Sequence, residues 1–211
     1  MTSTLVIDGH PNPESLTAAM AERYVAGNGN ARLLRLRELD FDPNLRLGYR
    51  GRIPIEPDLA DAREALHAAS RIVVASPMWW GSAPALLKGF FDRALLPHEE
   101  YEMTPLGFPR GLLAGRSGRL LLLSDTPGYA LPFMGTPAAA QIGRRTLKFC
   151  GVRPFRVHRF MGVGAASEGK ISRWLETSER IGAGDRQRDA GRPDETPKAR
   201  SAVLQSEPQR T

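Results

Sequence analysis

Residues 76–94 read SPMWWGSAPALLKGFFDRA, and this stretch decides the fold that we expect. The apolar run at residues 72–75 before it indicates a buried strand, and Pro84 predicts the start of a helix, where its missing N–H costs nothing. A strand therefore leads to a helix through a loop with two adjacent tryptophans. In an open parallel sheet, ligands bind in the crevice beyond the carboxyl ends of the strands. The sequence predicts a ligand site at this loop.

Strand and helix signals alternate along the rest of the chain. The expected strands span residues 4–8, 31–36, 71–76, 119–124 and 154–160. The expected helices span residues 15–25, 57–69, 84–95, 136–150 and 167–181. Strands separated by helices predict an α/β fold with a doubly wound, five-stranded parallel sheet and helices on both of its faces. Periodicity does not determine the order of the strands.

The first strand is followed by GHPNPESLTAAM, residues 9–20. Ser15 and Thr17 place hydroxyl groups at the start of a helix, where free N–H groups and the helix dipole favour an anion. The structural alternative is that Ser15 serves only as a helix cap. Neither G-x-G-x-x-G nor G-x-x-x-x-G-K-[ST] occurs, which argues against a Rossmann dinucleotide site and a P-loop.

The tryptophan pair has two interpretations. Trp79 and Trp80 could fill the core, because large aromatic side chains dominate core packing. They also lie between Pro77, which stiffens the backbone, and Gly81, which permits its close approach to a ligand. The second interpretation predicts a loop that faces a flat aromatic ring.

These stretches resemble the flavodoxin-like NAD(P)H:quinone oxidoreductases. In that family the backbone of a Pro-x-Trp-x-Gly loop lies along the edge of the flavin isoalloxazine ring. A Leu-Lys-Gly-Phe-Phe-Asp-Arg helix packs behind the loop and joins a dimer interface. The matching residues here are 77–81 and 87–93. The resemblance implies a flavodoxin-like fold with strand order 2-1-3-4-5, and a homodimer.

The resemblance also implies a set of flavin-binding residues. Residues 10–17 are similar to the family's phosphate-binding motif, His-Pro-x-x-x-Ser-x-Thr or Asn, and the SDTPGY run at 124–129 is similar to the loop on the pyrimidine side of the ring in one branch of the family. The implied flavin-binding residues are His10, Ser15, Leu16 (through its N–H), Thr17, Pro77, Met78, Trp79, Trp80, Gly81, Ser124, Thr126 and Gly128.

The activity implied by the resemblance is two-electron reduction of a quinone or a similar electrophile. FMN or FAD would be held non-covalently, with NAD(P)H as co-substrate in ping-pong kinetics. N–H groups of residues 78–81 would stabilise charge on the reduced ring. Tyr129 is the implied catalytic residue, but no histidine lies between it and His158, so the family's tyrosine and histidine pair is incomplete.

Two other classes of function remain open at the level of sequence. Some relatives of this fold are flavin-binding regulatory subunits of potassium-efflux transporters. A flavodoxin-type electron carrier is the other class, and such carriers usually have an acidic docking face. The formal net charge of +6 argues against the carrier.

Composition sets the expected boundaries of the domain. We expect one domain over residues 1–182 and a disordered tail over residues 183–211, which contain almost no large apolar residues. Without an apolar run of the ~18 residues that cross a membrane, and without a signal peptide, the chain is expected in the cytoplasm with no membrane insertion. The single Cys150 is expected to be a buried, small hydrophobic residue.

Neither nucleic acid nor a metal ion is an expected ligand. The 29 basic residues are dispersed along the chain, and no nucleic-acid-binding motif accompanies them. His98 begins the run HEEYE, but it has no second histidine at the spacing of metal ligands on a helix.

Overall fold

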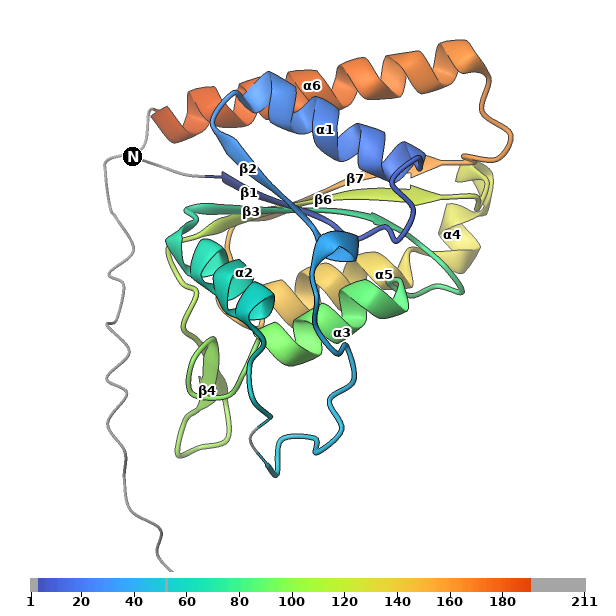
Figure 1. Cartoon of the computed structure of the whole chain (residues 1–211). Helices are drawn as coiled ribbons and strands as arrows, with labels where there is room; N and C mark the ends of the chain where they lie inside the picture. Colours follow the sequence, from blue (N-terminus) through green and yellow to red (C-terminus); the bar gives the residue numbers. More distant parts are fainter. Residues whose placement is uncertain (1–3, 52, 191–211) are drawn as a thin grey trace, which may run out of the picture.

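The computed structural model describes residues 4–51 and 53–190. A five-stranded parallel sheet lies between two layers of helices (Figure 1). Neighbouring strands follow the order β2-β1-β3-β6-β7. The strands are β1 (Thr4–Asp8), β2 (Ala31–Arg35), β3 (Arg71–Pro77), β6 (Ser117–Ser124) and β7 (Phe155–Met161).

A separate antiparallel hairpin explains the strand numbering. It consists of β4 (Tyr101–Met103) and β5 (Pro109–Gly111), and it lies in the connection for which the sequence predicted only a loop. Its three-residue strands are too short to show an alternating apolar pattern. In chain numbering the order is therefore not 2-1-3-4-5, as the resemblance implied. The two orders agree when the hairpin strands are left out of the numbering.

One layer of helices contains α1 (Leu16–Asn28) and α6 (Glu168–Ala190) (Figure 1). The other layer contains α2 (Pro57–Ala68), α3 (Ala85–Ala94), α5 (Pro137–Ala139) and the π-helix η3 (Ala140–Leu147). Short helical turns occur at η1 (Leu36–Glu38), η2 (Gly128–Ala130) and α4 (Leu131–Met134).

The alternation of side chains along the strands divides the core in two. On β3, Val74 packs with the α2 and α3 layer, whereas Val73 packs with the α1 and α6 layer. All seven residues of β3 are buried, as are all eight of β6. These fully buried parallel strands confirm the doubly wound architecture that the alternating signals predicted.

The last helix corrects the predicted end of the domain. Helix α6 continues to Ala190 instead of ending at residue 181, so the prediction of a disordered tail is wrong for residues 183–190. The reason is a buried charge network that an apolar count does not detect. The fully buried Asp185 accepts two hydrogen bonds of 2.6 Å from Arg119, and Asp189 accepts two from Arg71, at 2.9 and 2.5 Å. Residues 191–211 lie outside the described residues.

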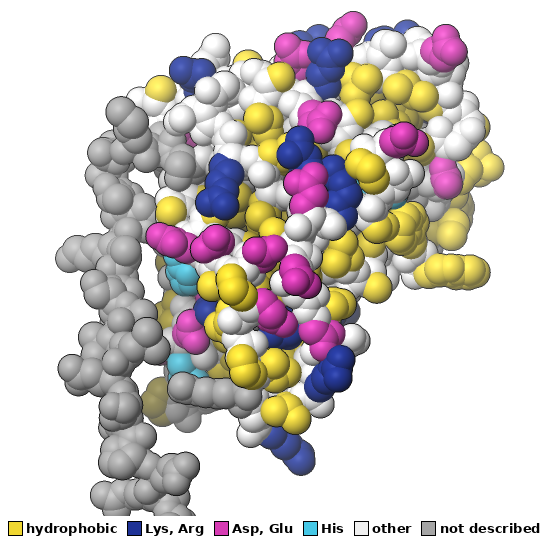
Figure 2. Space-filling view, viewed as in Figure 1, with side chains coloured by type: hydrophobic (Ala, Val, Ile, Leu, Met, Phe, Trp, Pro, Cys, Tyr) yellow, Lys and Arg dark blue, Asp and Glu magenta, His cyan; other side chains and the backbone are white. Residues whose placement is uncertain are grey.

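Four further sequence predictions concern Cys150, the spread of basic residues, membrane spans and metal ions. Cys150 is buried, as predicted, and burial raises the pKa of its thiol to about 12. On the face shown in Figure 2, basic and acidic side chains are interspersed, with no basic stripe. Within residues 4–51 and 53–190, no helix combines the length and apolar character of a membrane span, and no cluster of three or more His, Cys, Asp or Glu residues could hold a metal ion.

Candidate active site

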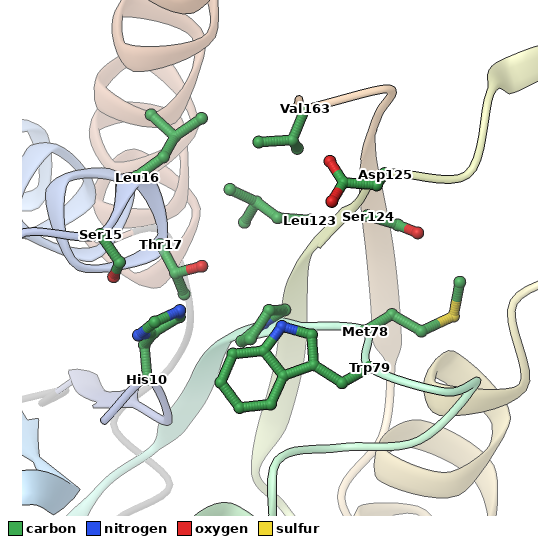
Figure 3. A pocket seen from close by; sticks show the side chains of 11 residues that line it. His10, Ser15, Leu16, Thr17, Met78, Trp79, Leu123, Ser124, Asp125 and Val163 are labelled. Carbon is green, nitrogen blue, oxygen red and sulfur yellow. The ribbon is translucent and has the colours of Figure 1, made fainter. Parts of the chain in front are cut away.

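A pocket of about 130 Å³ lies at the carboxyl ends of β1, β3 and β6 (Figure 3). It brings together residues of all three loops that the sequence singled out. The pocket is lined by His10, Ser15, Leu16, Thr17, Pro77, Met78, Trp79, Leu123, Ser124, Asp125 and Val163. The other predicted flavin-binding residues, which do not line it, are Trp80, Gly81, Thr126 and Gly128.

The start of helix α1 offers unpaired donors to this pocket. Ser15 is the N-cap, and its hydroxyl accepts a hydrogen bond of 3.1 Å from the Ala18 N–H, so its structural role as a cap is confirmed. Within the described part of the chain, the N–H groups of Leu16 and Thr17 have no acceptor, as expected for the first turn of a helix. The Thr17 hydroxyl also has no partner there and faces the pocket (Figure 3). This combination is suited to an anion.

His10 follows β1 and is held in one orientation. Its Nδ1 accepts a hydrogen bond of 3.0 Å from the Asn12 N–H, and the backbone N–H of His10 donates to the Asp8 carboxylate at 3.1 Å. Burial lowers the pKa of His10, although the nearby Asp8 opposes this shift. Because Nδ1 is an acceptor, the neutral ring carries its proton on Nε2, which is a donor. Arg37 forms an ion pair with the buried Asp8 and balances its charge.

The tryptophan loop forms a tight two-residue turn. Trp79 and Ser82 exchange backbone hydrogen bonds of 3.0 and 2.8 Å, and the two residues between them, Trp80 and Gly81, have φ values of 50° and 74°. Positive φ at both positions is the pattern of a type I′ turn. Trp79 is 44% exposed and Trp80 is fully exposed, so the interpretation of the pair as core filler is wrong.

This turn also corrects the expected set of free N–H groups. The Met78 N–H donates to the Leu123 carbonyl at 2.7 Å, and the Trp79 N–H is used within the turn. Both donors are occupied because the loop is built into the end of the sheet. Only Trp80 and Gly81, within residues 76–82, have N–H groups with no protein acceptor in the described chain.

The loop after β6 uses most of its polar groups internally. The Ser124 hydroxyl donates to the Thr126 hydroxyl at 3.0 Å and accepts from the Thr126 N–H at 3.1 Å. Tyr129 is 83% exposed and does not line the pocket. The structure therefore places the predicted catalytic tyrosine in the adjoining loop, outside the cleft.

Three residues of the pocket, Leu123, Asp125 and Val163, were not predicted from the sequence. Asp125 lies in the recognised SDTPGY run but was assigned no role. Its carboxylate accepts a hydrogen bond of 2.6 Å from the Gly164 N–H and so joins the loop after β7 to the site. The glycine-flanked GVG run at residues 162–164, directly after the fifth strand, was the available signal for this fourth loop.

The position of the cleft defines the class of the protein. β1 lies between β2 and β3, so the direction of strand order changes at β1 and β3, which is where doubly wound proteins of the flavodoxin type bind their ligand. A family model described as "Flavodoxin-like fold" matches residues 2–180. The chain belongs to this flavodoxin-like family.

Known proteins with similar sequences are oxidoreductases. The chain is 28% identical over 137 residues to human ribosyldihydronicotinamide dehydrogenase [quinone]. The aligned region covers 59% of this chain and 57% of the human protein. It is 33% identical over 122 residues to an uncharacterized NAD(P)H oxidoreductase of Haemophilus influenzae. That aligned region covers 53% of this chain and 59% of the Haemophilus protein. The chain thus spans less than two thirds of the length of either relative.

A solved structure shows the same fold at lower identity. An FMN-dependent NADH-azoreductase from Bacillus anthracis, determined in complex with FMN, superposes with a TM-score of 0.71 and 15% identity. The match covers 90% of this chain and 100% of the azoreductase chain.

Proposed function

We propose that this protein binds FMN or FAD non-covalently in the cleft at β1, β3 and β6, and that it reduces quinones or similar electrophiles with NAD(P)H. The observation that carries the proposal is the meeting of three features in one cleft. These are the open start of α1, the neutral His10 and the turn that bears Trp79. The names of the two relatives support the same class of reaction.

The residues present fit the polar end of a flavin. The unpaired N–H groups of Leu16 and Thr17, the Thr17 hydroxyl and the Nε2 proton of His10 would together hold a phosphate group. No Lys or Arg lines the described pocket, so phosphate binding would depend on these neutral donors and on the helix dipole. FMN and FAD share this phosphate, and the FMN complex of the azoreductase makes FMN the first flavin to test.

The tryptophan turn would form the wall of the site beside the ring. Trp79 presents a ring to the cleft, and the N–H groups of Trp80 and Gly81 are free to donate to a bound ligand. A bound flavin would supply the redox chemistry, accepting hydride from a nicotinamide and passing two electrons to the second substrate. Because both substrates would approach the same exposed side of the cleft, we propose ping-pong kinetics.

Tyr129 has a modest role in this proposal. Because Tyr129 is exposed and lies outside the pocket, we propose that it only adjusts the binding of the second substrate. The histidine that accompanies the tyrosine in the resembling family is missing. We therefore assign Tyr129 no obligatory proton transfer.

We also propose a homodimer, on evidence that differs from the sequence argument. Helix α3 buries Leu87, Phe90 and Phe91 within its own chain, so its apolar residues do not by themselves require a partner. The hairpin of β4 and β5 instead exposes Leu106 and Phe108. A hollow of about 290 Å³, lined in part by aromatic side chains, lies beside α3 and would be covered in a dimer. Sedimentation of the purified protein at micromolar concentration tests this proposal.

One experiment tests the proposed function. The protein is purified, its visible spectrum is recorded, and any released flavin is identified by mass; FMN is added if none is present. Bleaching of the bound flavin by NADH or NADPH, followed by recovery of its absorbance with a quinone, is the expected result. A protein that binds flavin but bleaches with neither nicotinamide would contradict the reductase assignment. A protein that binds neither FMN nor FAD would contradict the site itself.

A further inference from the structure

The tryptophan turn has a conformation that needs support. Trp80 has a φ of 50°, in the left-handed region that bulky L-residues rarely adopt. Its side chain is fully exposed, so burial of the indole does not offset the strain. A strained residue persists only where the surrounding structure holds it. The hold must come from the residues next to the turn.

Gln141 supplies that hold. Its side-chain carbonyl accepts a hydrogen bond of 3.0 Å from the Ser82 hydroxyl and a second of 2.9 Å from the Ala83 N–H. Pro137, four residues earlier, lies under the turn, because a Cβ atom added to Gly81 would be 3.6 Å from its Cγ. Segments that are 59 residues apart in the sequence are thus joined by a side chain whose oxygen serves two donors.

The helix that carries Gln141 is irregular at this position. It changes from α5 to the π-helix η3 at Ala140, directly before Gln141, and the wider turns continue to the Lys148 N–H, which donates to the Gly143 carbonyl at 2.8 Å. Single π-helical turns occur frequently at functional sites. Side-chain direction follows the rotation of the helix, so the change of helix type determines which residue faces the turn.

We propose that Gln141 is a positioning residue for the candidate flavin site. By fixing Ser82 and Ala83, it keeps Trp79 in the wall of the cleft beside His10. It also keeps the N–H groups of Trp80 and Gly81 free of hydrogen bonds within the protein, so that they can donate to a ligand. The part of this inference that concerns flavin rests on the proposed function. The part that concerns the turn does not.

The test uses the full chain and three variants. Gln141→Met keeps the length of the side chain and removes the acceptor, whereas Gln141→Glu keeps an acceptor oxygen and is the rescue variant. Ser82→Ala removes one of the two hydrogen bonds and is the milder variant if Gln141→Met does not fold. Gln187→Met is the matched control, because Gln187 is exposed on α6 in the opposite layer of helices.

Two measurements separate positioning from general stability. Amide hydrogen exchange of the flavin-free protein follows the Ala83 N–H, and titration with FMN gives the dissociation constant. In Gln141→Met we expect exchange of the hydrogen-bonded N–H groups of Trp79, Ser82 and Ala83 to rise by at least about tenfold. The FMN dissociation constant should also rise about tenfold, which corresponds to the loss of one or two neutral hydrogen bonds. Gln141→Glu should restore both values, Ser82→Ala should lie between, and Gln187→Met should match the unmodified protein.

The possible failures are distinguishable. If the unmodified protein binds FMN and Gln141→Met has the same exchange and the same dissociation constant, the positioning role is wrong while the proposed function stands. If exchange in Gln141→Met rises equally over the whole chain, Gln141 contributes only general stability and the inference is also wrong. If the unmodified protein binds no flavin, the proposed function fails, and the exchange at Ala83 still decides whether Gln141 holds the turn.

Discussion

His10 and Trp79 meet edge to face, with ring centroids 5.2 Å apart and an interplanar angle of 80°, although one follows β1 and the other follows β3. The contact joins the loop that begins α1 to the tryptophan turn. Such a geometry is a favourable arrangement for aromatic rings. It makes the two walls of the cleft a single unit, so a change in one loop is expected to affect the other.

Thr17→Val should weaken flavin binding and leave the fold intact. Thr17 is buried and its hydroxyl is unpaired in the described chain, so valine removes a donor without a change in shape. A hydrogen bond to a charged acceptor contributes about 1.5–3 kcal/mol, so we expect the dissociation constant of FMN to rise by about tenfold or more. Flavin fluorescence titration measures it.

Ser15→Ala serves as the comparison for that experiment. Ser15 caps α1, so its loss should lower the free energy of unfolding by about 1 kcal/mol. If Thr17→Val loses no affinity for flavin, the phosphate site is not at the start of α1.

Tyr129→Phe should slow turnover of a quinone, but by less than is typical for the loss of a general acid. That loss is roughly 10²- to 10⁴-fold. The smaller effect is expected because Tyr129 is exposed and lies outside the pocket. Stopped-flow mixing separates the two half-reactions. Reduction of the bound flavin by NADPH should be unchanged, and any loss should appear in reoxidation by the quinone. A loss of about 10⁴-fold would identify Tyr129 as an obligatory proton donor.

Asp185→Ala should be among the most destabilising substitutions in the chain. Asp185 is fully buried, accepts two hydrogen bonds from Arg119 and accepts one of 2.7 Å from the Tyr24 hydroxyl. Removal of one partner from a buried ion pair leaves an uncompensated charge and costs about 3–5 kcal/mol. Urea denaturation at neutral pH measures the change.

Glu179→Ala is the control for a surface ion pair. Glu179 pairs with Arg23 at 3.3 Å, and both side chains are about half exposed, so its removal should cost about 1 kcal/mol or less. Equal losses in the two variants would show that burial does not govern these pairs.

The lowered pKa of the Asp185 carboxylate predicts that the stability of the protein depends on pH. Burial alone would raise the pKa of Asp185, but hydrogen bonds from Arg119 and Tyr24 outweigh burial and lower it from 3.8 to about 2. A carboxyl group whose pKa is lowered by folding stabilises the protein above its unfolded pKa, and this contribution is lost as the pH falls from 3.8 toward 2. Urea denaturation at several pH values should show the loss, and Asp185→Asn should flatten it.

The sheet was predictable because its strands are nearly continuous apolar runs. Strand β1 occupies residues 4–8 as predicted, and β3 differs from the prediction by a single residue, Pro77. A parallel sheet buries both faces of a strand, so such runs are strong signals. The π-helix was not predictable, because the sequence of residues 140–147 fits an ordinary helical pattern.

The site was predictable where a motif met a helix start and not where a tertiary contact defined it. Ser15 and Thr17 were found because hydroxyl groups at the beginning of a helix have a known local role. Val163, which lines the pocket, and Gln141, which contacts the neighbouring turn, were missed because each belongs to an element distant in the sequence from the three recognised loops. The sequence also did not predict that the N–H groups of Met78 and Trp79 donate hydrogen bonds within the protein, since their acceptors depend on strand pairing and turn type.

The extension of α6 has a consequence for shortened forms of this protein. A truncation at residue 182, where the composition turns polar, would delete Asp185 and Asp189 together. Arg71 and Arg119 would then remain inside the protein without counter-charges, at the amino ends of two central strands. The minimal folding unit therefore has to include the whole of α6 to Ala190. The polar end of this helix belongs to the interior of the protein, because its carboxylates neutralise buried arginines of two central strands.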